Sequence, residues 1–400
     1  MRNPFRRPPA VKASRTARLV SIETLGRPVW TPRDYAALAR EGYMRNAVAH
    51  RCVALLAQAA AALPLLLYAG DRELARHPLL DLLARPNPRQ AGTALLEAAY
   101  GHLLVAGNCY LEAVAVEGEV RELFALRPDR IKVVPGRDGW PLAYDYTVGG
   151  ATVRLDQGAL PVPHVLHLSL FHPLDDHYGL SPLEAAATAL DTHNAAAAWQ
   201  KALIDNSARP SGALVYDGQD GAALTAEQFS RLKSELEESF QGAANAGRPL
   251  LLEGGLDWKP MALGPRDLDF AELRNAAARE IALAFGVPPM LLGIPGDNTF
   301  ANYREANRAL LRQTALPLAG RMLDGLANWL SPAFGGEALR LAPDLDRVEA
   351  LSEEREALWR RLAAADFLTR AEKREAVGYG AGEGQGQGEG QRQGEAGGEA

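Results

Sequence analysis

DLDFAELRNAAAREIALAFGVPPMLLGIPGDNTFANYREANR, the stretch from Asp267 to Arg308, holds the main clue to how this chain folds. Its first part places apolar residues at helical spacing, and the run Gly286-Val287-Pro288-Pro289 predicts where that helix ends. The apolar positions are Phe270, Leu273, Ala277, Ile281 and Ala284. A loop from Gly293 to Asn302 leads into a second helix, which we expect to begin at Tyr303 with Asn302 and Glu305 as its cap. The stretch contains no activated nucleophile, metal cluster or phosphate-binding loop, so it favours a mechanical role over a catalytic one.

Another long helix is predicted upstream, where Ser181-Pro182-Leu183-Glu184 has the composition of a capping box. The helix can continue to about Ser207, which makes it roughly 26 residues or ~39 Å long. Nine of the residues between Leu183 and Asn206 are alanine. Such an excess indicates either close packing against identical neighbouring subunits or simply a codon usage rich in alanine, and both interpretations stay open.

Between these two helices the sequence predicts a small α/β module of about 50 residues. It begins with a strand at 213–216, continues with a helix capped by Thr225, and ends with strands at 250–253 and 257–261, the last of which contains Trp258. The helix has an apolar face made of Phe229, Leu232, Leu236 and Phe240. Because the module interrupts two helices, we expect it to lie at the end of a helical stalk.

The N-terminal half is predicted to be α+β. Helical spacing covers 33–67 and again 95–106, where Gly107-Asn108 is a typical helix stop. Short β-branched runs separated by glycine or proline then predict strands at 109–114, 121–126, 131–134, 143–148, 151–155 and 165–168.

The C-terminal part is predicted to be helical. The helix that begins near Tyr303 should be kinked at Pro317, and a final amphipathic helical block is expected from Arg347 to Glu375. The last twenty residues, 381–400, are almost entirely Gly, Glu and Gln and are expected to be disordered.

Composition restricts the class of protein. With 47% hydrophobic and 23% charged residues, the 400-residue chain has the composition of a soluble globular protein, and no run approaches the ~20 apolar residues of a membrane span. Cys52 and Cys109 lie in apolar segments and are expected to be buried free thiols, which favours a cytoplasmic origin. A net charge of −6 argues against tight binding of duplex DNA. The first thirty residues are basic and are expected to form a flexible arm.

With this order of elements, the chain resembles the portal protein family of tailed double-stranded-DNA bacteriophages and of phage-derived gene transfer agents. The resemblance spans roughly 35–330 and depends on the order of several short motifs. They are Arg85-Pro86-Asn87-Pro88, Gly107-Asn108-Cys109-Tyr110, Arg127-Pro128-Asp129-Arg130-Ile131, His164-Val165-Leu166-His167, Gly179-Leu180-Ser181-Pro182-Leu183, Asn245-Ala246-Gly247-Arg248-Pro249 and the run from Ile281 to Gly293.

The resemblance implies a multidomain α+β fold that assembles as a ring, usually of twelve subunits. After the arm at 1–30, it implies a wing at 31–180 and 303–343, stem helices at 181–210 and 266–290, and a clip at 211–265. It further implies a tunnel loop region at 291–302 and a crown at 344–380, before the tail at 381–400. This crown is short for the family, so a role in head-size control, which is attributed to a large crown, is not expected.

The resemblance also implies a function without catalysis. The ring would carry double-stranded DNA, without sequence specificity, at one vertex of a capsid during packaging and ejection. Its implied partners are a packaging ATPase, the major capsid protein and a head-completion protein, with no cofactor and no membrane. The chain would occupy the host cytoplasm during assembly and then the virion.

Site residues follow from the same resemblance. The loop facing DNA would contain Gly296, Asp297, Asn298, Thr299, Phe300 and Asn302. The stem would contribute Glu184, Asp191, Lys201, Asp269, Glu272, Arg274 and Arg279, and the clip would dock partners through Phe229, Leu232, Leu236 and Trp258. Small, polar and mixed-charge residues suit a wall that must not hold DNA tightly, since strong neutralisation of phosphates would trap it.

An alternative hypothesis uses the polar cluster between His164 and His177. Its members are His164, His167, His172, Asp175, Asp176 and His177. A metal-dependent DNA-processing protein of the packaging apparatus would need about three such groups to converge on one ion. Against this, side chains alternate along a strand, so His164 and His167 should point to opposite faces.

Overall fold

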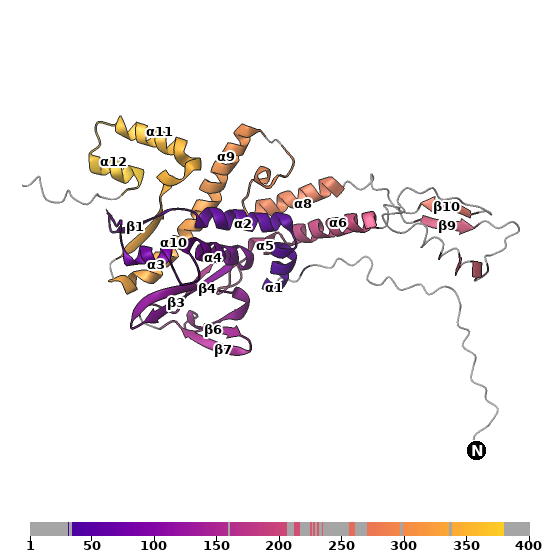
Figure 1. Ribbon diagram of the computed structural model, residues 1–400, viewed down its shortest axis with the longest axis horizontal. Coiled ribbons are helices and arrows are strands. Elements are labelled where there is room, and N and C mark those ends of the chain that lie inside the picture. The colour runs from indigo at the N-terminus through magenta and orange to yellow at the C-terminus, as the bar shows by residue number, and fades with distance from the viewer. Residues whose placement is uncertain are drawn as a thin grey trace, which may run out of the picture.

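The structure is a computed structural model that describes residues 31, 34–158, 161–205, 212–216, 225, 227, 228, 230, 231, 234, 256–260, 270–296, 299–335 and 338–379. A mixed α+β body lies on one side of the molecule, and a pair of helices leaves it towards a separate pair of antiparallel strands (Figure 1). No helix of the described part is long and apolar enough to cross a membrane.

Four helices and a three-stranded sheet form the main core of the body. Helices α2 (Ala47–Ala61), α3 (Pro78–Ala84), α4 (Gly92–Ala106) and α10 (Leu316–Leu330) bury their leucine and alanine faces together. Against them lies the sheet β4-β3-β8, made of Glu119–Leu126, Asn108–Val116 and Val165–Ser169. The strands predicted for these three segments are confirmed, because each has the local β-branched pattern and glycine turns that the prediction used.

A second small sheet joins distant parts of the chain. Strand β1 (Leu65–Ala69) pairs antiparallel with β11 (Leu339–Pro343) on one side and with the short β2 (Arg72–Glu73) on the other. The expected helix over 33–67 is therefore wrong at its end, since α2 stops at Ala61 and Leu65 begins a strand. Pro64 allows this change, because proline cannot continue a hydrogen-bonded helix.

The third sheet, β5-β6-β7, consists of Ile131–Pro135, Pro141–Val148 and Ala151–Asp156 and lies at the lower edge of the body in Figure 1. All three strands were predicted. A small core of Tyr110, Ile131, Tyr144, Leu155 and Val165 joins this sheet to β3 and β8.

The chain enters the body through an irregular helical segment. Helix α1 (Tyr35–Ala37) continues as a π-helix, η1 (Leu38–Met44). The side chain of Asn46 then caps the start of α2. A second core cluster, which includes Leu38, Leu56, Leu183, Ile281 and Phe285, packs this segment against the base of the helix pair.

Two backbones cross without side chains at Gly107 and Gly179. Gly107, with φ near +71°, ends α4, and a Cβ on either glycine would overlap the backbone of the other. Asn108 secures the crossing, because its Oδ1 accepts from Gly179 N at 2.8 Å. This contact fixes the start of the helix pair relative to the sheet.

Helix α9 (Phe300–Leu310), the π-helix η6 (Leu311–Ala315) and α10 form one long helical path. Pro317 was expected to kink it, and a π-helical segment lies just before the proline, near the start of α10. A proline leaves the carbonyl one turn earlier without its usual donor, and a wider turn accommodates that.

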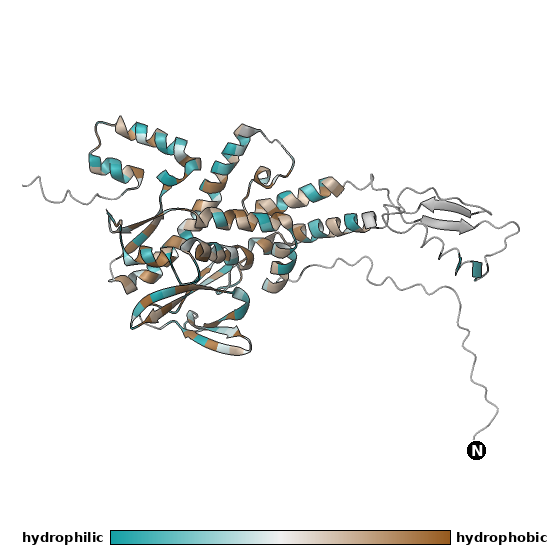
Figure 2. Ribbon diagram, viewed as in Figure 1, coloured by the Kyte–Doolittle hydropathy of each residue, from teal (hydrophilic) through white to brown (hydrophobic). Residues whose placement is uncertain are grey.

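The helical block predicted from Arg347 to Glu375 consists of two helices. Turns η8 (Leu345–Arg347) and η9 (Glu349–Leu351) precede α11 (Ser352–Ala363) and α12 (Arg370–Val377). These helices are largely hydrophilic (Figure 2), and Asp346 of η8 joins α11 to Tyr379 just beyond α12. The Asp346 carboxylate accepts hydrogen bonds from Arg355, from Trp359 Nε1 at 3.3 Å and from Tyr379 Oη at 2.6 Å.

Candidate functional site at the helix pair and its loop

The helix pair consists of α6 (Ala187–Asp205) and α8 (Phe270–Ala284), which run side by side out of the body (Figure 1). Alanine makes up part of the buried surface of the pair: Ala189 and Ala196 of α6 are buried, as are Ala277 and Ala282 of α8. Small residues let two helices approach closely, so part of the alanine excess is explained by packing within one chain. Ala195, Ala198 and Ala202 are exposed, and packing of these residues against neighbouring subunits stays a prediction.

The start of the pair differs from its prediction. Ser181 caps a short helix, α5 (Pro182–Ala185), by accepting from Leu183 N at 3.0 Å. The helix then breaks at Ala186, whose φ and ψ of −88° and 5° are not helical, and α6 starts at Ala187. The expected single helix from Pro182 to Ser207 is therefore wrong. Ser181 Oγ also donates to Leu104 O at 3.1 Å, which fastens α5 to the end of α4.

At its outer end the pair is joined by one aromatic and one polar contact. The rings of Trp199 and Phe270 lie 4.1 Å apart, and Arg274 Nη1 donates to Gln200 Oε1 at 2.9 Å. Both contacts run from α6 to α8, so they hold the outer turns of the two helices together.

Beyond the pair, the structure describes two strands and a turn of the inserted module. Strands β9 (Gly212–Tyr216) and β10 (Leu256–Pro260) pair antiparallel, with Trp258 opposite Leu214, as the predicted strands allow. Thr225 and Gln228 cap each other, since Thr225 N donates to Gln228 Oε1 and Gln228 N donates to Thr225 Oγ1. Phe229, Leu232 and Leu236, predicted to dock partners, lie outside the described residues, as does the strand expected at 250–253.

Helix α8 ends where the sequence predicts. Gly286 takes a left-handed φ of 63°, and Val287 N donates back to Ala282 O at 2.9 Å, which satisfies a carbonyl of the last turn. Thr314 Oγ1 donates to Gly286 O at 2.9 Å, so this stop is also bonded to η6. The expected apolar face of α8 is only partly right, because Leu273 is 46% exposed.

The loop after the turn η5 (Pro289–Leu292) is attached at both of its described ends. Arg279 of α8 donates to the Pro295 carbonyl, and its guanidinium lies against Gly296, where a side chain would collide with it. At the other end, Thr299 Oγ1 accepts from Asn302 N at 3.2 Å and caps α9. Asn302 and Glu305 were expected to cap a helix starting at Tyr303; the helix starts at Phe300, because Thr299 is a suitable cap three residues earlier. Asp297 and Asn298 lie outside the described residues.

The remaining predicted stem residues do not form one cluster. Asp191 accepts from the backbone N of Thr31 at 2.9 Å and from its hydroxyl, which ties the N-terminal segment to α6. Glu184 is half-buried on α5, whereas Lys201, Glu272 and Arg279 are exposed. Asp269 lies outside the described residues. The described surface of the pair therefore carries both signs of charge, and a channel wall of mixed charge stays a prediction.

The histidines of the alternative hypothesis have separate partners. His167 is enclosed between Tyr110, whose ring it stacks on at 4.3 Å, and Tyr144, and burial lowers the pKa of His167 to about 4. His164 Nδ1 lies 3.0 Å from the Asp156 carbonyl, and Asp175 accepts from the backbone of His177 and Tyr178. No three His, Cys, Asp or Glu side chains converge as metal ligands anywhere in the described chain, so the cluster offers no metal site there.

Cys52 and Cys109 are both free and buried, as predicted. Burial raises the pKa of each thiol to about 12. Neither thiol is therefore a reactive nucleophile near neutral pH.

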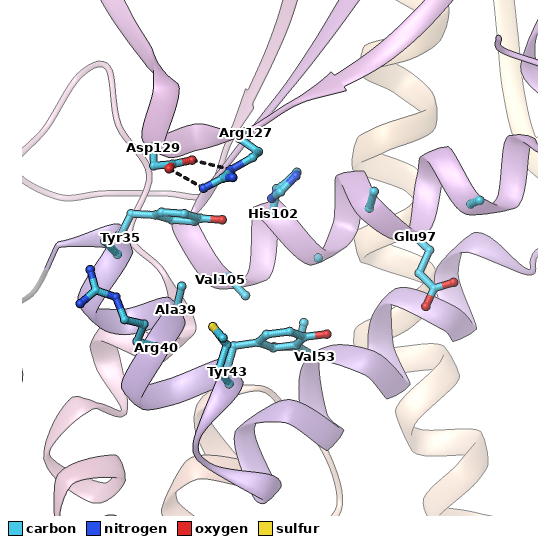
Figure 3. A pocket seen from close by; sticks show the side chains of 15 residues that line it. Tyr35, Ala39, Arg40, Tyr43, Val53, Glu97, His102, Val105, Arg127 and Asp129 are labelled. Atoms are coloured by element: carbon cyan, nitrogen blue, oxygen red, sulfur yellow. Dashed lines mark hydrogen bonds and ion pairs between the residues drawn. The ribbon is translucent and has the colours of Figure 1, made fainter. Parts of the chain in front are cut away.

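A large groove that the sequence did not predict lies between α1, η1, α2 and α4 (Figure 3). Its volume is about 760 Å³, and most of its lining is apolar, including Val53, Val105 and the ring of Tyr43. One side carries the ion pair of Arg127 and Asp129, with two hydrogen bonds of 3.0 and 2.7 Å, next to Tyr35. Helical spacing placed Tyr35, Tyr43 and Val53 near one face, but nothing local indicated that this face stays uncovered.

Comparison with known proteins gives one consistent group. Residues 47–378 match the family model described as phage portal protein. The chain is 57% identical to a chain in the neck of an empty GTA particle computed with C6 symmetry, covering 88% of this chain and 95% of that one, with a TM-score of 0.70. For the neck of a native GTA particle computed with C12 symmetry, the identity is 56%, the coverage 90% and 98%, and the TM-score 0.67.

Curated relatives agree with this group. A protein of Rickettsia bellii is 42% identical over 342 residues, which cover 84% of this chain and 88% of the relative. The portal protein of Enterobacteria phage HK97 is 27% identical over 309 residues, which cover 74% and 69% respectively.

Proposed function

The chain belongs to the phage portal protein family, and on that premise we propose that its copies form the ring-shaped DNA channel at one vertex of a phage-like capsid. Portal proteins are structural, so the expectation that the chain is not an enzyme is confirmed. The observation that carries the proposal is the 56% identity, over 90% of this chain, to a chain in a GTA neck computed with C12 symmetry. We expect the ring to contain twelve subunits.

The test is the mass of the purified full-length protein. Native mass spectrometry should give a closed oligomer near twelve subunits, and negative-stain images should show rings with a central hole. A protein that stays monomeric under every condition, including inside assembled heads, contradicts the proposal.

Within the ring, we assign 181–210 and 266–290 to the stem, 211–265 to the clip, and 31–180 with 303–343 to the wing. The paired helices α6 and α8, the strand pair β9–β10 beyond them and the mixed body support this division. Residues 344–380 form a short crown, and Tyr68 of β1 anchors it by donating to Gly378 O at 3.0 Å.

The partners follow from these positions. The clip at the outer end of the stem is the surface we assign to the packaging ATPase and later to the head-completion protein, and the wing contacts the major capsid protein. Deleting 217–255 and joining β9 to β10 by a short turn should leave the body folded and abolish binding of the ATPase. A variant that binds the ATPase normally contradicts this assignment.

The loop at 291–302 is proposed to face the DNA. Deleting Asp297 to Phe300 would also remove the Thr299 cap of α9, so a cleaner variant changes only Asp297→Gly and Asn298→Gly. We expect this variant to form rings normally while packaging or retaining less DNA. Thr369→Ala is the control for a weakened helix start, since it removes the cap of α12 at a cost of about 1 kcal/mol and leaves every residue of the loop in place.

A further inference from the structure

The loop that follows β8 presents two large apolar side chains to solvent on a fixed backbone. Phe171 is 80% exposed and Leu174 is 91% exposed. The backbone around them is held by its own bonds: His172 Nδ1 accepts from Leu174 N at 3.1 Å, and Asp175 Oδ1 accepts from His177 N at 2.8 Å. An ordered loop that exposes apolar side chains indicates a contact surface, because ordering it beforehand lowers the entropic cost of binding.

The groove described above offers an apolar concave surface for this loop. Its interior is apolar around Val53 and Val105, and Met44 at its edge is 75% exposed. Arg40 lies at the rim with its guanidinium turned away from the cavity (Figure 3), and no carboxylate of the described chain pairs with it.

The charges of the two surfaces match. Asp176, next to the exposed Leu174, likewise has no cationic partner among the residues that the structure describes. Within the described chain, the loop is apolar and carries one unpaired carboxylate, and the groove is apolar and carries one unpaired guanidinium. The two surfaces are therefore alike in hydrophobic character and opposite in charge.

The two surfaces also follow two different strands of one sheet. In the sheet β4-β3-β8, Tyr110 of the central strand is opposite Leu126 of β4 and His167 of β8. The chain leaves β4 towards Arg127 and Asp129 at the groove, and it leaves β8 towards Phe171 and Leu174. The groove and the loop thus start from opposite edges of the same end of the sheet and are two separate surfaces. A head-to-tail ring contact joins two different surfaces of the subunit.

We propose that the loop 171–176 of each subunit inserts Phe171 and Leu174 into the groove between η1 and α4 of the next subunit, with Asp176 facing Arg40. The proposal rests on the ring proposed above and names one of its contacts. The occupant of the groove is a second copy of this chain.

The test is a double-cysteine variant, Met44→Cys with Leu174→Cys, in the full-length protein. Both positions are highly exposed, so the fold should not change, and the native thiols are buried and unreactive. Mild oxidation of the purified ring should give a ladder of covalent oligomers on a non-reducing denaturing gel. Met44→Cys with Trp140→Cys is the matched control, because Trp140 is 75% exposed in the turn between β5 and β6 and should give no ladder.

The outcomes separate the two proposals. A closed ring in native mass spectrometry with no ladder overturns this contact and leaves the ring proposal standing, whereas a protein that forms no ring overturns both. A faster-migrating monomer band means that the loop reaches the groove of its own chain, which also overturns the contact. If the cysteine introduced at position 44 resists a thiol reagent in the ring and becomes reactive after residues 1–30 are removed, the N-terminal arm fills the groove instead.

A charge exchange gives an independent measurement. Arg40→Asp or Asp176→Arg alone should weaken subunit association about twofold to fivefold per contact, and the double variant should restore it. Equal weakening in the single and double variants would show that the two side chains do not face each other.

Discussion

Ser181 is bonded to two helices at once. Its hydroxyl accepts from Leu183 at the start of α5 and donates to Leu104, one of the carbonyls without a partner in the last turn of α4. The side chain is 2% exposed, so water cannot replace either bond.

We therefore expect Ser181→Ala to lower the free energy of unfolding by about 1–3 kcal/mol. Urea unfolding followed by circular dichroism measures the change. Ser352→Ala is the control, since Ser352 is exposed and its side chain makes no hydrogen bond within the described chain; it should shift stability by no more than about 0.5 kcal/mol. Equal shifts for both variants would contradict the double role of Ser181.

Asp346 should make stability depend on pH in acid. The hydrogen bonds from Arg355 first, and then from Tyr379 and Trp359, lower the pKa of its carboxyl from 3.8 to about 2. Because the folded pKa is the lower one, its stabilising contribution of about 2 kcal/mol is complete above pH 4 and is lost as the pH falls from about 4 to about 2. Asp346→Asn should remove this part of the pH dependence. The measurement is the urea midpoint of unfolding as a function of pH between pH 5 and pH 2. If the midpoint of Asp346→Asn falls as steeply with pH as that of the unchanged protein, the bonded carboxylate is not the cause.

Elements with local signals were predicted well. Strands β3 to β8 were found because each is a short β-branched run between glycine or proline turns, and α8 was found because Gly286 and two prolines mark its end. The sheet β11-β1-β2 was missed because its central pairing joins Leu65–Ala69 to Leu339–Pro343, and no local pattern reports a partner so distant in sequence.

The helix boundaries failed for a different physical reason. Ala186 has a high helix propensity, so nothing in the sequence predicts the break there; packing of Leu183 and Ala186 against the body determines it. At α9, two acceptable caps lie three residues apart, Thr299 and Asn302, and the chain uses the first. Boundaries of this kind depend on tertiary contacts, whereas the existence of each helix depends on its own residues.

The packing of α8 against its neighbouring helices gives a matched pair of variants. Ala282 is fully buried and Leu283, its neighbour, is 79% exposed. Ala282→Leu should destabilise the protein by about 1–3 kcal/mol through overpacking, and Leu283→Ala should change the stability of the isolated chain by less than about 0.5 kcal/mol. Thermal unfolding at low protein concentration checks both. If Ala282→Leu leaves the thermal unfolding unchanged, the helices are more loosely packed than described.

For the molecule as a whole, the C-terminal helices are attached at their last residues. Tyr68 Oη donates to Gly378 O at 3.0 Å, Arg355 donates to Val377 O at 2.7 Å, and Tyr379 reaches Asp346. We expect that removing 381–400 leaves the melting temperature unchanged, whereas removing 370–400 lowers it by several degrees. Differential scanning calorimetry of the two truncated chains measures this, and equal melting temperatures would mean that α12 contributes nothing to the fold.

The proposed loop and clip residues depended on the family resemblance more than on local chemistry. Polar loops such as 297–299 occur in many proteins. Whether such a loop faces a channel depends on how the subunits are arranged around the axis of a ring. The groove beside Tyr35 was not predicted at all, since whether an apolar helix face is covered within one chain can only be seen once the chain is folded.

The crossing of Gly107 and Gly179 has a consequence for how the sequence can evolve. Each glycine excludes a side chain on the other, so an alanine at either position collides with backbone that cannot rotate away, and changing both makes the collision worse. In a library of all single substitutions, these two positions should accept no replacement. Gly101, where an added methyl meets nothing within 4 Å, should accept alanine freely. Neither member of the crossing can change first, so no stepwise route leads away from the pair while this junction persists.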